Sequence, residues 1–588
     1  MCGIVGYKGF KKASKILLDS VRRLEYRGYD SVGMAVLGES GIIVKKGAGN
    51  VDKVNNELFF EELEGSIGVA HTRWATTGEV NNVNSHPHLS NNNKICVVHN
   101  GIVENYQEIK KFLENKGFCF ISQTDTEVIP NYVQYFIDNG ESFEDAVKKT
   151  LRIIKGSFAV VIMSEDDGII IGARRGSPLV LGIGFGEFFL ASDVPAFSEC
   201  TDKVVYLDDD EFAVLGDDYH IYDFNTGREN FKKINIINWS FEQAKKGEYE
   251  HFMLKEINEQ GNTIKKAAEQ SIELIREATD LINGACGVFL VGCGTSYHAC
   301  VSASYIFSKI AKKHVNVLLA SEFRNYEHFL SSNTLVIAVS QSGETADVID
   351  AVSFAKKHGC RTLSIVNVMG STLTRLCSLN IMMNAGPEIC VLSTKSYTSQ
   401  LAVLTLLAYS AVDKFKQAKK LLVDVAGKVN DLINNINDDL KLLAGKLKRV
   451  NDLFLIGRDL AYPSALEGAL KIKEVSYIHA EGFAGAELKH GTMALIQDGV
   501  PVIALNTRGT NDLLVNNIME VKARGAFVIG IDSRNNELYD FFIKVPGADI
   551  ADPVLMIIPI QLLAYYLALA KNLNPDQPRN LAKSVTVK

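Results

Sequence analysis

The chain begins with Cys2-Gly3-Ile4-Val5-Gly6-Tyr7, a short apolar stretch that places a cysteine directly behind Met1. Because cysteine is small, we expect Met1 to be removed, which leaves Cys2 with a free α-amine beside its thiol. That amine is a base with a pKa of roughly 8 and can accept the thiol proton itself. The alternative is a small buried residue that opens a strand. The apolar residues that follow predict a strand that ties the terminus down, which favours an ordered nucleophile.

Short apolar stretches and turns continue to about residue 227. Residues 68–71, 95–99, 158–163 and 168–173 predict strands, and residues 13–24 and 126–137 predict helices. We therefore expect residues 2–227 to form an α+β domain of stacked antiparallel sheets with helices. The polar, irregular sequence over residues 228–248 predicts a linker, and a helical stretch follows it.

Polar side chains follow two of these predicted strands. His71-Thr72-Arg73-Trp74-Ala75-Thr76 comes after one, and His99-Asn100-Gly101 ends another. An asparagine amide beside a glycine N–H can form an oxyanion hole, although an ordinary tight turn is the alternative. Arg73 suits a carboxylate, and Asp125 suits an ammonium group or a helix cap. Together with Cys2, these groups predict hydrolysis of an amino-acid side-chain amide.

The second part of the chain contains an internal repeat. Phe289-Leu290-Val291-Gly292 recurs as Phe454-Leu455-Ile456-Gly457, and each copy has a tyrosine five residues after its last glycine. Apolar stretches alternate with amphipathic helices in both copies, which predicts parallel sheets with crossover helices. We expect two α/β domains, over residues 281–420 and 445–575. The second copy has Asn506 where the first has Ser340, so the copies are not equivalent in function.

Hydroxyl-rich turns follow two strands of the first copy. They are Gly292-Cys293-Gly294-Thr295-Ser296 and Ser340-Gln341-Ser342-Gly343-Glu344-Thr345, each followed by a predicted helix. Such turns meet at one edge of a parallel sheet and can hold an anion with N–H and hydroxyl groups, although a plain strand-to-helix turn is the alternative. No P-loop lysine is present, so a phosphosugar fits better than a nucleoside triphosphate. Ser393-Thr394-Lys395 is either a third loop of this site or a helix cap.

Charged residues in the second copy share one helix face. Glu467, Lys471 and Glu474 have the spacing i, i+4 and i+7. A surface ion-pair ladder is the alternative, but the apolar neighbours Leu470 and Ile478 favour burial. A buried carboxylate beside an ammonium group is suited to proton transfer.

Two further residues are candidates for this chemistry. His490, in Glu487-Leu488-Lys489-His490-Gly491, has a side chain that can transfer protons near neutral pH or serve a structural role. The C-terminal segment, residues 576–588, is too apolar for a solvated tail. Its Lys583 is either a surface charge or, if it docks in a pocket, a Schiff-base lysine.

Composition narrows the class of protein. The net charge of −7 over 588 residues argues against a general nucleic-acid binder. The 10 cysteines form no C-x-x-C pair, so neither a zinc site nor a disulfide framework is predicted. Residues 554–570 are apolar but contain Pro559 and Gln561, which predicts a buried core helix rather than a membrane span. We expect a soluble cytoplasmic protein without a signal peptide and without nucleic-acid or membrane partners.

The combined motifs resemble the glutamine–fructose-6-phosphate aminotransferase family along nearly the whole chain. The segments that carry the resemblance are CGIVGY (2–7), YRGYDS (26–31), AHTRWAT (70–76), HNGIVEN (99–105), GCGTSYHA (292–299), SQSGETAD (340–347), ALEGALKIKEVSYIHAE (465–481), ELKHG (487–491) and DQPRNLAKSVTV (576–587). The resemblance implies an N-terminal-nucleophile glutaminase followed by two sugar isomerase domains and a catalytic tail. It also implies a homodimer or higher homo-oligomer, with no metal or organic cofactor, acting on glutamine and fructose 6-phosphate.

The resemblance also assigns roles to residues of this chain. Cys2 would attack glutamine, with Asn100 and Gly101 as the oxyanion hole. Glu474 would move a proton between C1 and C2 of the sugar, while Lys583 forms an imine with it and His490 of the partner subunit assists ring opening. The implied glutamine-binding residues are Arg73, Trp74, Thr76, His86 and Asp125, and Trp74 would also gate an ammonia channel. The implied sugar-phosphate residues are Thr295, Ser296, Ser340, Gln341, Ser342, Thr345, Val391, Ser393, Glu467, Lys471 and Ala582.

A few positions depart from the family pattern. Thr77 stands where the family usually has histidine, which bears on the detail of glutamine binding, and Leu392 replaces a usual alanine beside the sugar loop. A different phosphosugar acceptor is therefore a second hypothesis, and Leu392 is its support. A third hypothesis is a phosphosugar-binding regulator with a silent glutaminase. The presence of Cys2, Asn100, Glu474 and Lys583 argues against it.

Overall fold

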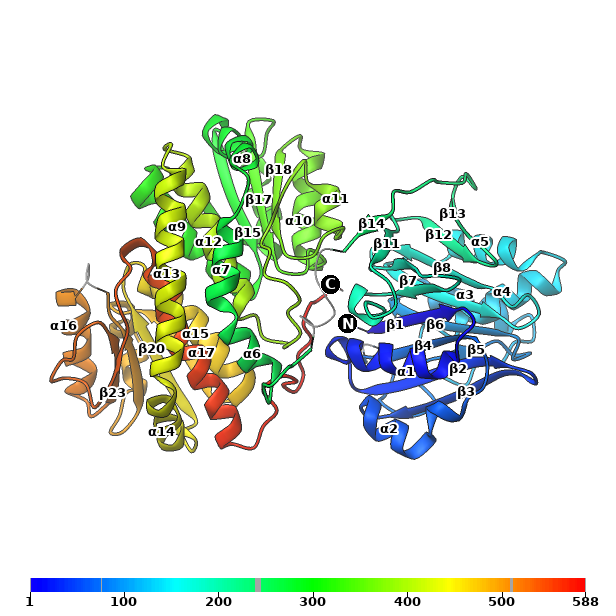
Figure 1. Ribbon diagram of the computed structural model, residues 1–588, viewed down its shortest axis with the longest axis horizontal. Helices are drawn as coiled ribbons and strands as arrows, with labels where there is room; N and C mark the ends of the chain where they lie inside the picture. Colours follow the sequence, from blue (N-terminus) through cyan, green and yellow to red (C-terminus); the bar gives the residue numbers. More distant parts are fainter. Residues whose placement is uncertain (1, 76, 238–244, 508–510, 587–588) are drawn as a thin grey trace. The chain divides into compact units, whose positions relative to one another are not determined.

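The computed structural model describes residues 2–75, 77–237, 245–507 and 511–586. The chain divides into two compact units (Figure 1). The first comprises Met1–Lys245 together with Ala582–Lys588, and the second comprises Lys246–Leu581. Each unit has its own sheets and its own hydrophobic core.

Two antiparallel sheets form the centre of the first unit. The strands of the larger sheet are β1 (Gly3–Lys8), β2 (Ser31–Gly38), β3 (Gly41–Ala48), β4 (Ile67–Arg73), β9 (Val180–Ile183), β10 (Phe188–Ala191), β11 (Lys203–Tyr206) and β14 (Asn235–Ile236). Those of the smaller sheet are β5 (His88–Leu89), β6 (Ile95–Gly101), β7 (Phe158–Ser164), β8 (Ile170–Arg175), β12 (Glu211–Leu215) and β13 (Tyr219–Asp223). The spatial orders are β14-β11-β9-β10-β1-β4-β2-β3 and β13-β12-β8-β7-β6-β5. The predicted antiparallel sheets are thus confirmed.

Helices cover the outer faces of the two stacked sheets. They are α1 (Ala13–Leu24), α2 (Val51–Leu58), α3 (Tyr106–Glu114), α4 (Val128–Asp138) and α5 (Phe143–Ile153). Ile4 and Val69 of the larger sheet meet Val98 and Val161 of the smaller one in a shared core. The other face of the smaller sheet packs against α3, α4 and α5. The layer order is therefore helix, sheet, sheet, helix.

The sequence predicts two α-helices in this unit, and the structure contains more. The helix over residues 13–24 is confirmed, and the one expected from residue 126 begins at Val128. The additional helices are α2, α3 and α5. Helices α2 and α3 have only 8 and 9 residues, so each carries only a few apolar residues that mark its buried face. The sequence does signal α5, because the Ser142 hydroxyl accepts a hydrogen bond from the Asp145 N–H and caps the helix.

Strand β1 lies inside its sheet, between β4 and β10. Its glycines allow close packing on both faces. A Cβ on Gly3 would lie 2.8 Å from Leu24 Cβ, and one on Gly6 would lie 2.8 Å from Val161 Cγ1. The prediction of a buried strand that begins behind Cys2 is confirmed, and this strand fixes the position of Cys2.

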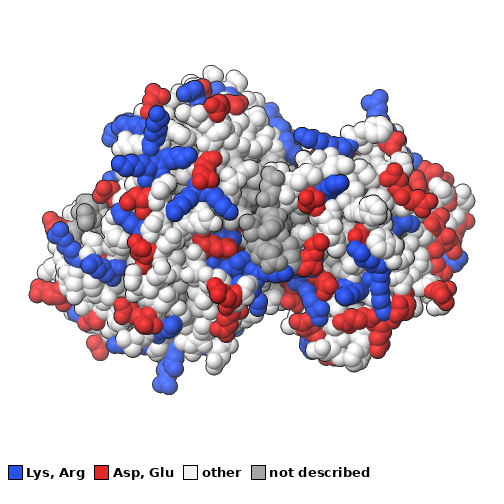
Figure 2. Space-filling view, viewed as in Figure 1, with Lys and Arg blue, Asp and Glu red and all other residues white. Residues whose placement is uncertain are grey.

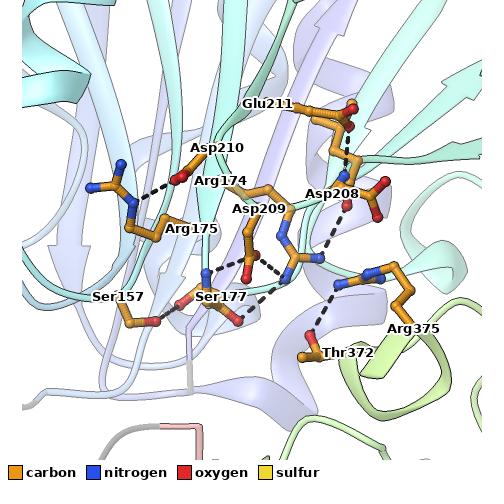
Figure 3. A network of polar contacts seen from close by, with 12 residues as sticks. Ser157, Arg174, Arg175, Ser177, Asp208, Asp209, Asp210, Glu211, Thr372 and Arg375 are labelled. Atoms are coloured by element: carbon orange, nitrogen blue, oxygen red, sulfur yellow. Dashed lines mark hydrogen bonds and ion pairs between the residues drawn. The ribbon is translucent and has the colours of Figure 1, made fainter. Parts of the chain in front are cut away.

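Two arginines of β8 pair with aspartates of an acidic run, Asp208-Asp209-Asp210-Glu211 (Figure 3). Buried Arg174 pairs with Asp209 at 2.9 Å and donates to the Leu207 carbonyl at 3.3 Å. Arg175 pairs with Asp210 at 2.6 Å. These contacts anchor the turn that enters β12, so the charge run has a structural role.

The second unit contains two parallel sheets, as predicted. The strands of the first are β15 (Gly287–Gly292), β16 (Asn316–Leu319), β17 (Thr334–Ser340), β18 (Arg361–Val366) and β19 (Leu379–Met382). Those of the second are β20 (Asp452–Gly457), β21 (His479–Ala484), β22 (Pro501–Leu505), β23 (Phe527–Asp532) and β24 (Phe541–Lys544). Their orders, β16-β15-β17-β18-β19 and β21-β20-β22-β23-β24, are the same when each copy is counted from its first strand. The internal repeat is therefore a structural repeat.

The repeated glycine has a packing reason in both copies. A Cβ on Gly292 would lie 3.0 Å from the Ser296 carbonyl carbon, and one on Gly457 would lie 2.5 Å from the Ala461 carbonyl oxygen. In each copy the chain turns from strand to helix so tightly that the helix backbone approaches the end of the strand. Only glycine permits this approach.

Helices join the two sheets into one unit. They are α6 (Phe252–Asn258), α7 (Gln260–Ala268), α8 (Ile272–Gly284), α9 (Gly294–Ile306), α10 (Ala346–Lys357), α11 (Thr372–Leu376), α12 (Lys395–Ser410), α13 (Phe415–Asn435), α14 (Asn437–Leu447), α15 (Ala461–Ser476), α16 (Asn511–Lys522) and α17 (Asp552–Ala570). One continuous core includes residues of β15, β20, α9, α12, α15 and α17. Helices α10 and α11 cover the other face of the first sheet, and α16 covers the other face of the second.

Helix α17 belongs to the segment Asp549–Ala570, which is long and apolar enough to cross a membrane. The structure places 83% of its most apolar window inside the protein. The predicted buried core helix is confirmed. On the face drawn in Figure 2, lysine and arginine side chains are interspersed with aspartate and glutamate.

Replacing Gly457 with alanine tests the strand-to-helix packing. The added Cβ meets backbone atoms that cannot rotate away, so we expect the free energy of unfolding to fall by about 1–3 kcal/mol. Gly427→Ala, in the middle of α13, is the matched control because a Cβ there meets nothing within 4 Å. It should stabilise the protein by about 0.5–1 kcal/mol. Calorimetry of the two variants measures both effects, and equal stabilities would contradict the packing argument.

Candidate active sites

Cys2 lies directly before β1, beside the end of β4. Its sulfur accepts a hydrogen bond from the Trp74 N–H at 3.2 Å and lies 3.4 Å from the Trp74 carbonyl oxygen. The Cys2 carbonyl accepts from Asn100 Nδ2 at 2.8 Å and from Arg27 Nε at 3.3 Å. Burial raises the pKa of the Cys2 thiol. A thiol in this position needs a base to become a nucleophile.

Asn100 and Gly101 end strand β6 and pair with Ala159 and Phe158 of β7. They therefore belong to a strand, not to the tight turn considered above. The Asn100 amide nitrogen points at the residue that carries the thiol. Gly101 has φ of +122°, and a Cβ there would lie 1.9 Å from the Ser157 carbonyl oxygen. Only glycine fits at this position, where its backbone comes next to the asparagine amide.

Two of the predicted glutamine-binding residues, Arg73 and Asp125, are buried in the same unit as this thiol. Arg73, at the end of β4, is buried, and it donates to the Glu79 carbonyl at 3.2 Å and to the Thr77 carbonyl. Asp125 is buried too and accepts a hydrogen bond from the Val103 N–H at 2.6 Å. The helix-cap alternative for Asp125 is wrong, because α4 begins at Val128 with Glu127 as its N-cap residue. Thr76 lies outside the described residues.

His86 belongs to a cluster of buried histidines that sequence reasoning did not find as a group. Its ring stacks on His71 with 4.1 Å between centroids, and its Nδ1 accepts from the His99 N–H at 3.3 Å. Burial lowers the pKa of His71 to about 3 and that of His86 well below the usual value. Both rings are neutral at physiological pH, so His86 can act there through hydrogen bonds but not through charge. No metal-binding group of side chains is found in the part of the chain that the structure describes.

The first hydroxyl-rich turn lies where α9 begins. The Ser296 hydroxyl accepts a hydrogen bond from Gln400 Nε2 at 3.0 Å, so its own proton can be donated to a ligand. The Thr295 hydroxyl donates to Glu467 Oε1 at 3.0 Å and accepts from Lys471 Nζ at 3.0 Å. Its proton is thus committed within the protein. A ligand at this turn would meet the backbone of Thr295 and the hydroxyl of Ser296.

The second hydroxyl-rich turn connects β17 to α10. The Ser340 hydroxyl accepts from the Gly343 N–H at 3.1 Å and contacts Thr345 Oγ1 at 3.1 Å. Ser342 Oγ accepts from the Glu344 N–H at 3.1 Å, while the side chain of Gln341 is partly exposed. These contacts shape the loop before any ligand binds. Because β15 and β17 are adjacent, both turns lie at the same edge of the sheet.

The Glu467, Lys471 and Glu474 side chains form a cluster on α15, and the predicted burial of this face is confirmed for Glu467 and Lys471. Lys471 Nζ lies 3.3 Å from Glu467 Oε1 and 2.8 Å from Glu474 Oε2, and it donates to the Ser393 carbonyl at 3.3 Å. The side chains of Glu467 and Lys471 are fully buried, whereas that of Glu474 is 20% exposed. Burial alone would lower the pKa of Lys471, but the two carboxylates outweigh it and raise the pKa, so the ammonium persists.

Other predicted residues of the second unit lie around this cluster or outside it. Ser393 contributes its carbonyl, and the loop is not a side-chain cap, because α12 begins at Lys395 without one. The Val391 N–H donates to the Asp576 carbonyl at 3.2 Å, which ties this loop to the C-terminal segment. His490 is exposed and follows a short 3₁₀ helix, Glu487–Lys489. Among the described contacts, none joins His490 to the cluster.

Ala582 and Lys583 lie in the segment that groups with the first unit. Their roles at the sugar site stay predictions. Two residues missed by sequence reasoning belong to the cluster and the first turn. His298 contacts Glu467 and lies three residues after Thr295 on the same helix face. This i, i+3 spacing is visible in the segment GCGTSYHA. Gln400 holds Ser296 from α12, and no sequence pattern marks it.

Comparison with known proteins finds one type of domain in the first unit and another type, matched twice, in the second. A glutamine amidotransferase domain model matches residues 71–199, and a SIS domain model matches residues 281–410 and 446–571. The C-terminal domain of glucosamine-fructose-6-phosphate aminotransferase from Francisella tularensis is 32% identical, with a TM-score of 0.52 over 57% of this chain and 100% of that one. A tagatose-6-phosphate ketose/aldose isomerase from Escherichia coli shares the fold, with a TM-score of 0.50 and 17% identity over 56% of this chain and 97% of its own.

Relatives of full length carry a common name, glutamine–fructose-6-phosphate aminotransferase (isomerizing). The protein from Thermococcus kodakarensis is 46% identical over 602 residues, and the one from Clostridium acetobutylicum is 43% identical over 619 residues. The alignments cover 100% of this chain and 100% of each relative. The chain therefore belongs to the glutamine–fructose-6-phosphate aminotransferase (isomerizing) family.

Proposed function

We propose that this protein transfers the amide nitrogen of glutamine to fructose 6-phosphate and isomerises the product to glucosamine 6-phosphate, releasing glutamate. This reaction is the first step of amino-sugar biosynthesis. The observation that carries the proposal is that one chain holds both a partly buried thiol beside an asparagine amide and a Glu467–Lys471–Glu474 cluster bonded to a hydroxyl-rich turn. The first group suits amide hydrolysis, and the second suits proton transfer on a phosphosugar.

In the first half-reaction, Cys2 attacks the glutamine side-chain amide after Met1 is removed. The freed α-amine takes the thiol proton, because burial keeps the thiol protonated on its own. Asn100 Nδ2 and the Gly101 N–H stabilise the oxyanion. The α-ammonium returns its proton to the departing nitrogen, which leaves as ammonia, and water then hydrolyses the thioester to glutamate. Arg73 binds the substrate carboxylate and Asp125 its ammonium group, and both side chains are held in place by backbone contacts.

Three further residues complete the proposed glutamine site and the route of ammonia. His86 contacts glutamine as a neutral ring, and Thr76 binds it as well. Trp74 gates the channel through which ammonia leaves. The hydrogen bond between the Trp74 N–H and the Cys2 sulfur supports this role, because it keeps the Trp74 backbone beside the nucleophile.

In the second half-reaction, the turns at Ser296 and at Ser340–Thr345 hold the phosphate. Lys583 forms an imine with the sugar carbonyl as water leaves, and ammonia from the first half-reaction then displaces the lysine amine to give the imine of the sugar phosphate. Glu474 moves a proton between C1 and C2 of that imine, which gives the amino sugar. The partial exposure of Glu474 beside a persistent ammonium supports this role, because the carboxylate can reach a ligand while Lys471 stays fixed. His490 of the partner subunit assists ring opening in a cytoplasmic homodimer or larger homo-oligomer. No step requires a metal or organic cofactor.

The other hypotheses gain nothing from the geometry. Leu392, the support for a different acceptor sugar, has its side chain buried in the hydrophobic core of the second unit. A silent glutaminase is disfavoured by the arrangement of Asn100 and Arg27 on the Cys2 carbonyl. A direct test supplies amide-15N glutamine and fructose 6-phosphate and identifies the products by mass spectrometry while free ammonia is monitored. We expect 15N-labelled glucosamine 6-phosphate with little free ammonia, and labelled ammonia alone would contradict the proposal.

Replacing Cys2 with alanine tests the nucleophile. Without a thiol no acyl intermediate forms, so glutamine-driven synthesis should fall by at least about a thousandfold while sugar-phosphate isomerisation stays measurable. Cys119→Ala is the control, because Cys119 is a free, exposed cysteine of the same unit. Loss of both activities on folded Cys2→Ala protein would contradict separate sites.

Replacing Lys583 with arginine should have the reverse effect. A guanidinium keeps the charge but cannot form an imine at neutral pH, so amino-sugar synthesis should be lost while glutamine hydrolysis continues. Lys571→Arg, a lysine just beyond α17, serves as the control. Synthesis and hydrolysis are measured on the same preparation. Normal synthesis by Lys583→Arg would rule out the imine at this residue.

A further inference from the structure

His298 connects the two α/β copies through a hydrogen bond to a buried carboxylate. It lies on α9, its side chain is 16% exposed, and its Nδ1 lies 2.8 Å from Glu467 Oε2. Glu467 lies on α15 and is fully buried. A carboxylate is the acceptor in this pair, so Nδ1 carries the hydrogen. The contact thus supplies a hydrogen-bond donor to a buried carboxylate oxygen.

The two oxygens of Glu467 have different partners. Oε1 receives the Thr295 hydroxyl at 3.0 Å and faces Lys471 Nζ at 3.3 Å, while Oε2 receives His298. This division orients the carboxylate. A buried acceptor without a hydrogen bond is costly. Without His298, the Glu467 carboxylate would therefore rotate until both of its oxygens contact the Lys471 ammonium.

Lys471 has several acceptors to serve. Its three protons are shared among Thr295 Oγ1, the Ser393 carbonyl, Glu467 Oε1 and Glu474 Oε2, at 2.8–3.3 Å. The shortest of these separations is the one to Glu474. Because Lys471 has only three N–H protons for these acceptors, a stronger hydrogen bond from Lys471 to Glu467 weakens the one from Lys471 to Glu474. The orientation of Glu467 therefore controls the environment of the Glu474 carboxylate.

The internal repeat shows that this contact is not a general feature of the α/β unit. In the register set by Gly292 and Gly457, His298 corresponds to Pro463, and Glu467 corresponds to Ser302. Each copy therefore provides one partner that the other lacks. The histidine lies in the copy with the hydroxyl-rich turns, and the glutamate lies in the copy with the proposed proton-transfer carboxylate.

We propose that His298 is a positioning residue for the sugar reaction: by donating to Glu467 it keeps Lys471 against Glu474. This inference rests on the proposed function of the same site. His298 acts as a hydrogen-bond donor and not through charge. An asparagine, whose Nδ2 can reach the position of histidine Nδ1, should therefore replace it, and a leucine should not.

The test compares His298→Leu and His298→Asn in the full-length enzyme. The measurements are kcat and KM for fructose 6-phosphate in glutamine-driven synthesis, and the incorporation of solvent deuterium at C1 and C2 of the sugar. We expect His298→Leu to lower kcat and deuterium incorporation by about 10- to 100-fold, the range typical of residues that orient a reacting group, with KM almost unchanged. His298→Asn should stay within about threefold of the wild type. Glutamine hydrolysis without sugar should not change in either variant.

Controls separate positioning from a structural effect. His328→Leu removes an exposed histidine of the same unit and should leave all rates unchanged. In a Glu467→Gln background the His298→Leu change should have a smaller effect than in the wild type, because the two act in series. If His298→Leu fails to fold, His298→Ala replaces it in the same measurements. The double variant His298→Asn/Glu467→Gln is then compared with Glu467→Gln alone.

The outcomes are distinguishable. Wild-type kcat and deuterium incorporation in His298→Leu would overturn the inference, as would an asparagine variant as slow as the leucine variant. A raised KM with unchanged kcat would also overturn it, because that result indicates a role in binding alone. Absence of amino-sugar synthesis by the wild-type protein would instead overturn the proposed function on which the inference rests.

Discussion

The buried Lys471 ammonium is the constraint around which the second unit is built. Moving a charged lysine and a charged glutamate out of water is costly unless each charge finds partners of good geometry. Here those partners come from both α/β copies: Glu467 and Glu474 from α15, Thr295 from the start of α9, and the Ser393 carbonyl from the loop before α12. Neither copy could hold the ammonium by itself. The repeat therefore has to pair its two halves to make one site.

The first unit depends on a comparable constraint, which lies at the start of the chain. Cys2 can act only if the terminus is held, and β1 holds it because neighbouring strands pair on both sides and Gly3 and Gly6 allow close packing. Asn100 and Arg27 then fix the Cys2 carbonyl. The strand that folds the sheet is thus also the strand that positions the nucleophile, so fold and chemistry are set by the same few residues.

Patterns within single elements predicted much of this. The alternating apolar stretches, the repeated Phe-Leu-Val/Ile-Gly segment and the i, i+4, i+7 spacing on α15 each lie in one strand or helix, and the structure confirms the sheets, the repeat and the buried face. What sequence could not provide are contacts made between elements. Gln400 reaches Ser296 from a different helix, and Asp125 accepts from Val103, a loop residue. The short helices α2 and α3 were missed because each has too few apolar residues to mark a buried face without the sheet that it packs against.

The central claim is that Glu474, kept beside the Lys471 ammonium, moves the proton between C1 and C2. The most direct measurement follows solvent deuterium into the sugar phosphate in Glu474→Gln, with borohydride trapping of the Lys583 imine on the same protein. The account predicts that deuterium incorporation falls by about 10²- to 10⁴-fold while the imine is still trapped. Incorporation at the wild-type rate in Glu474→Gln would contradict it.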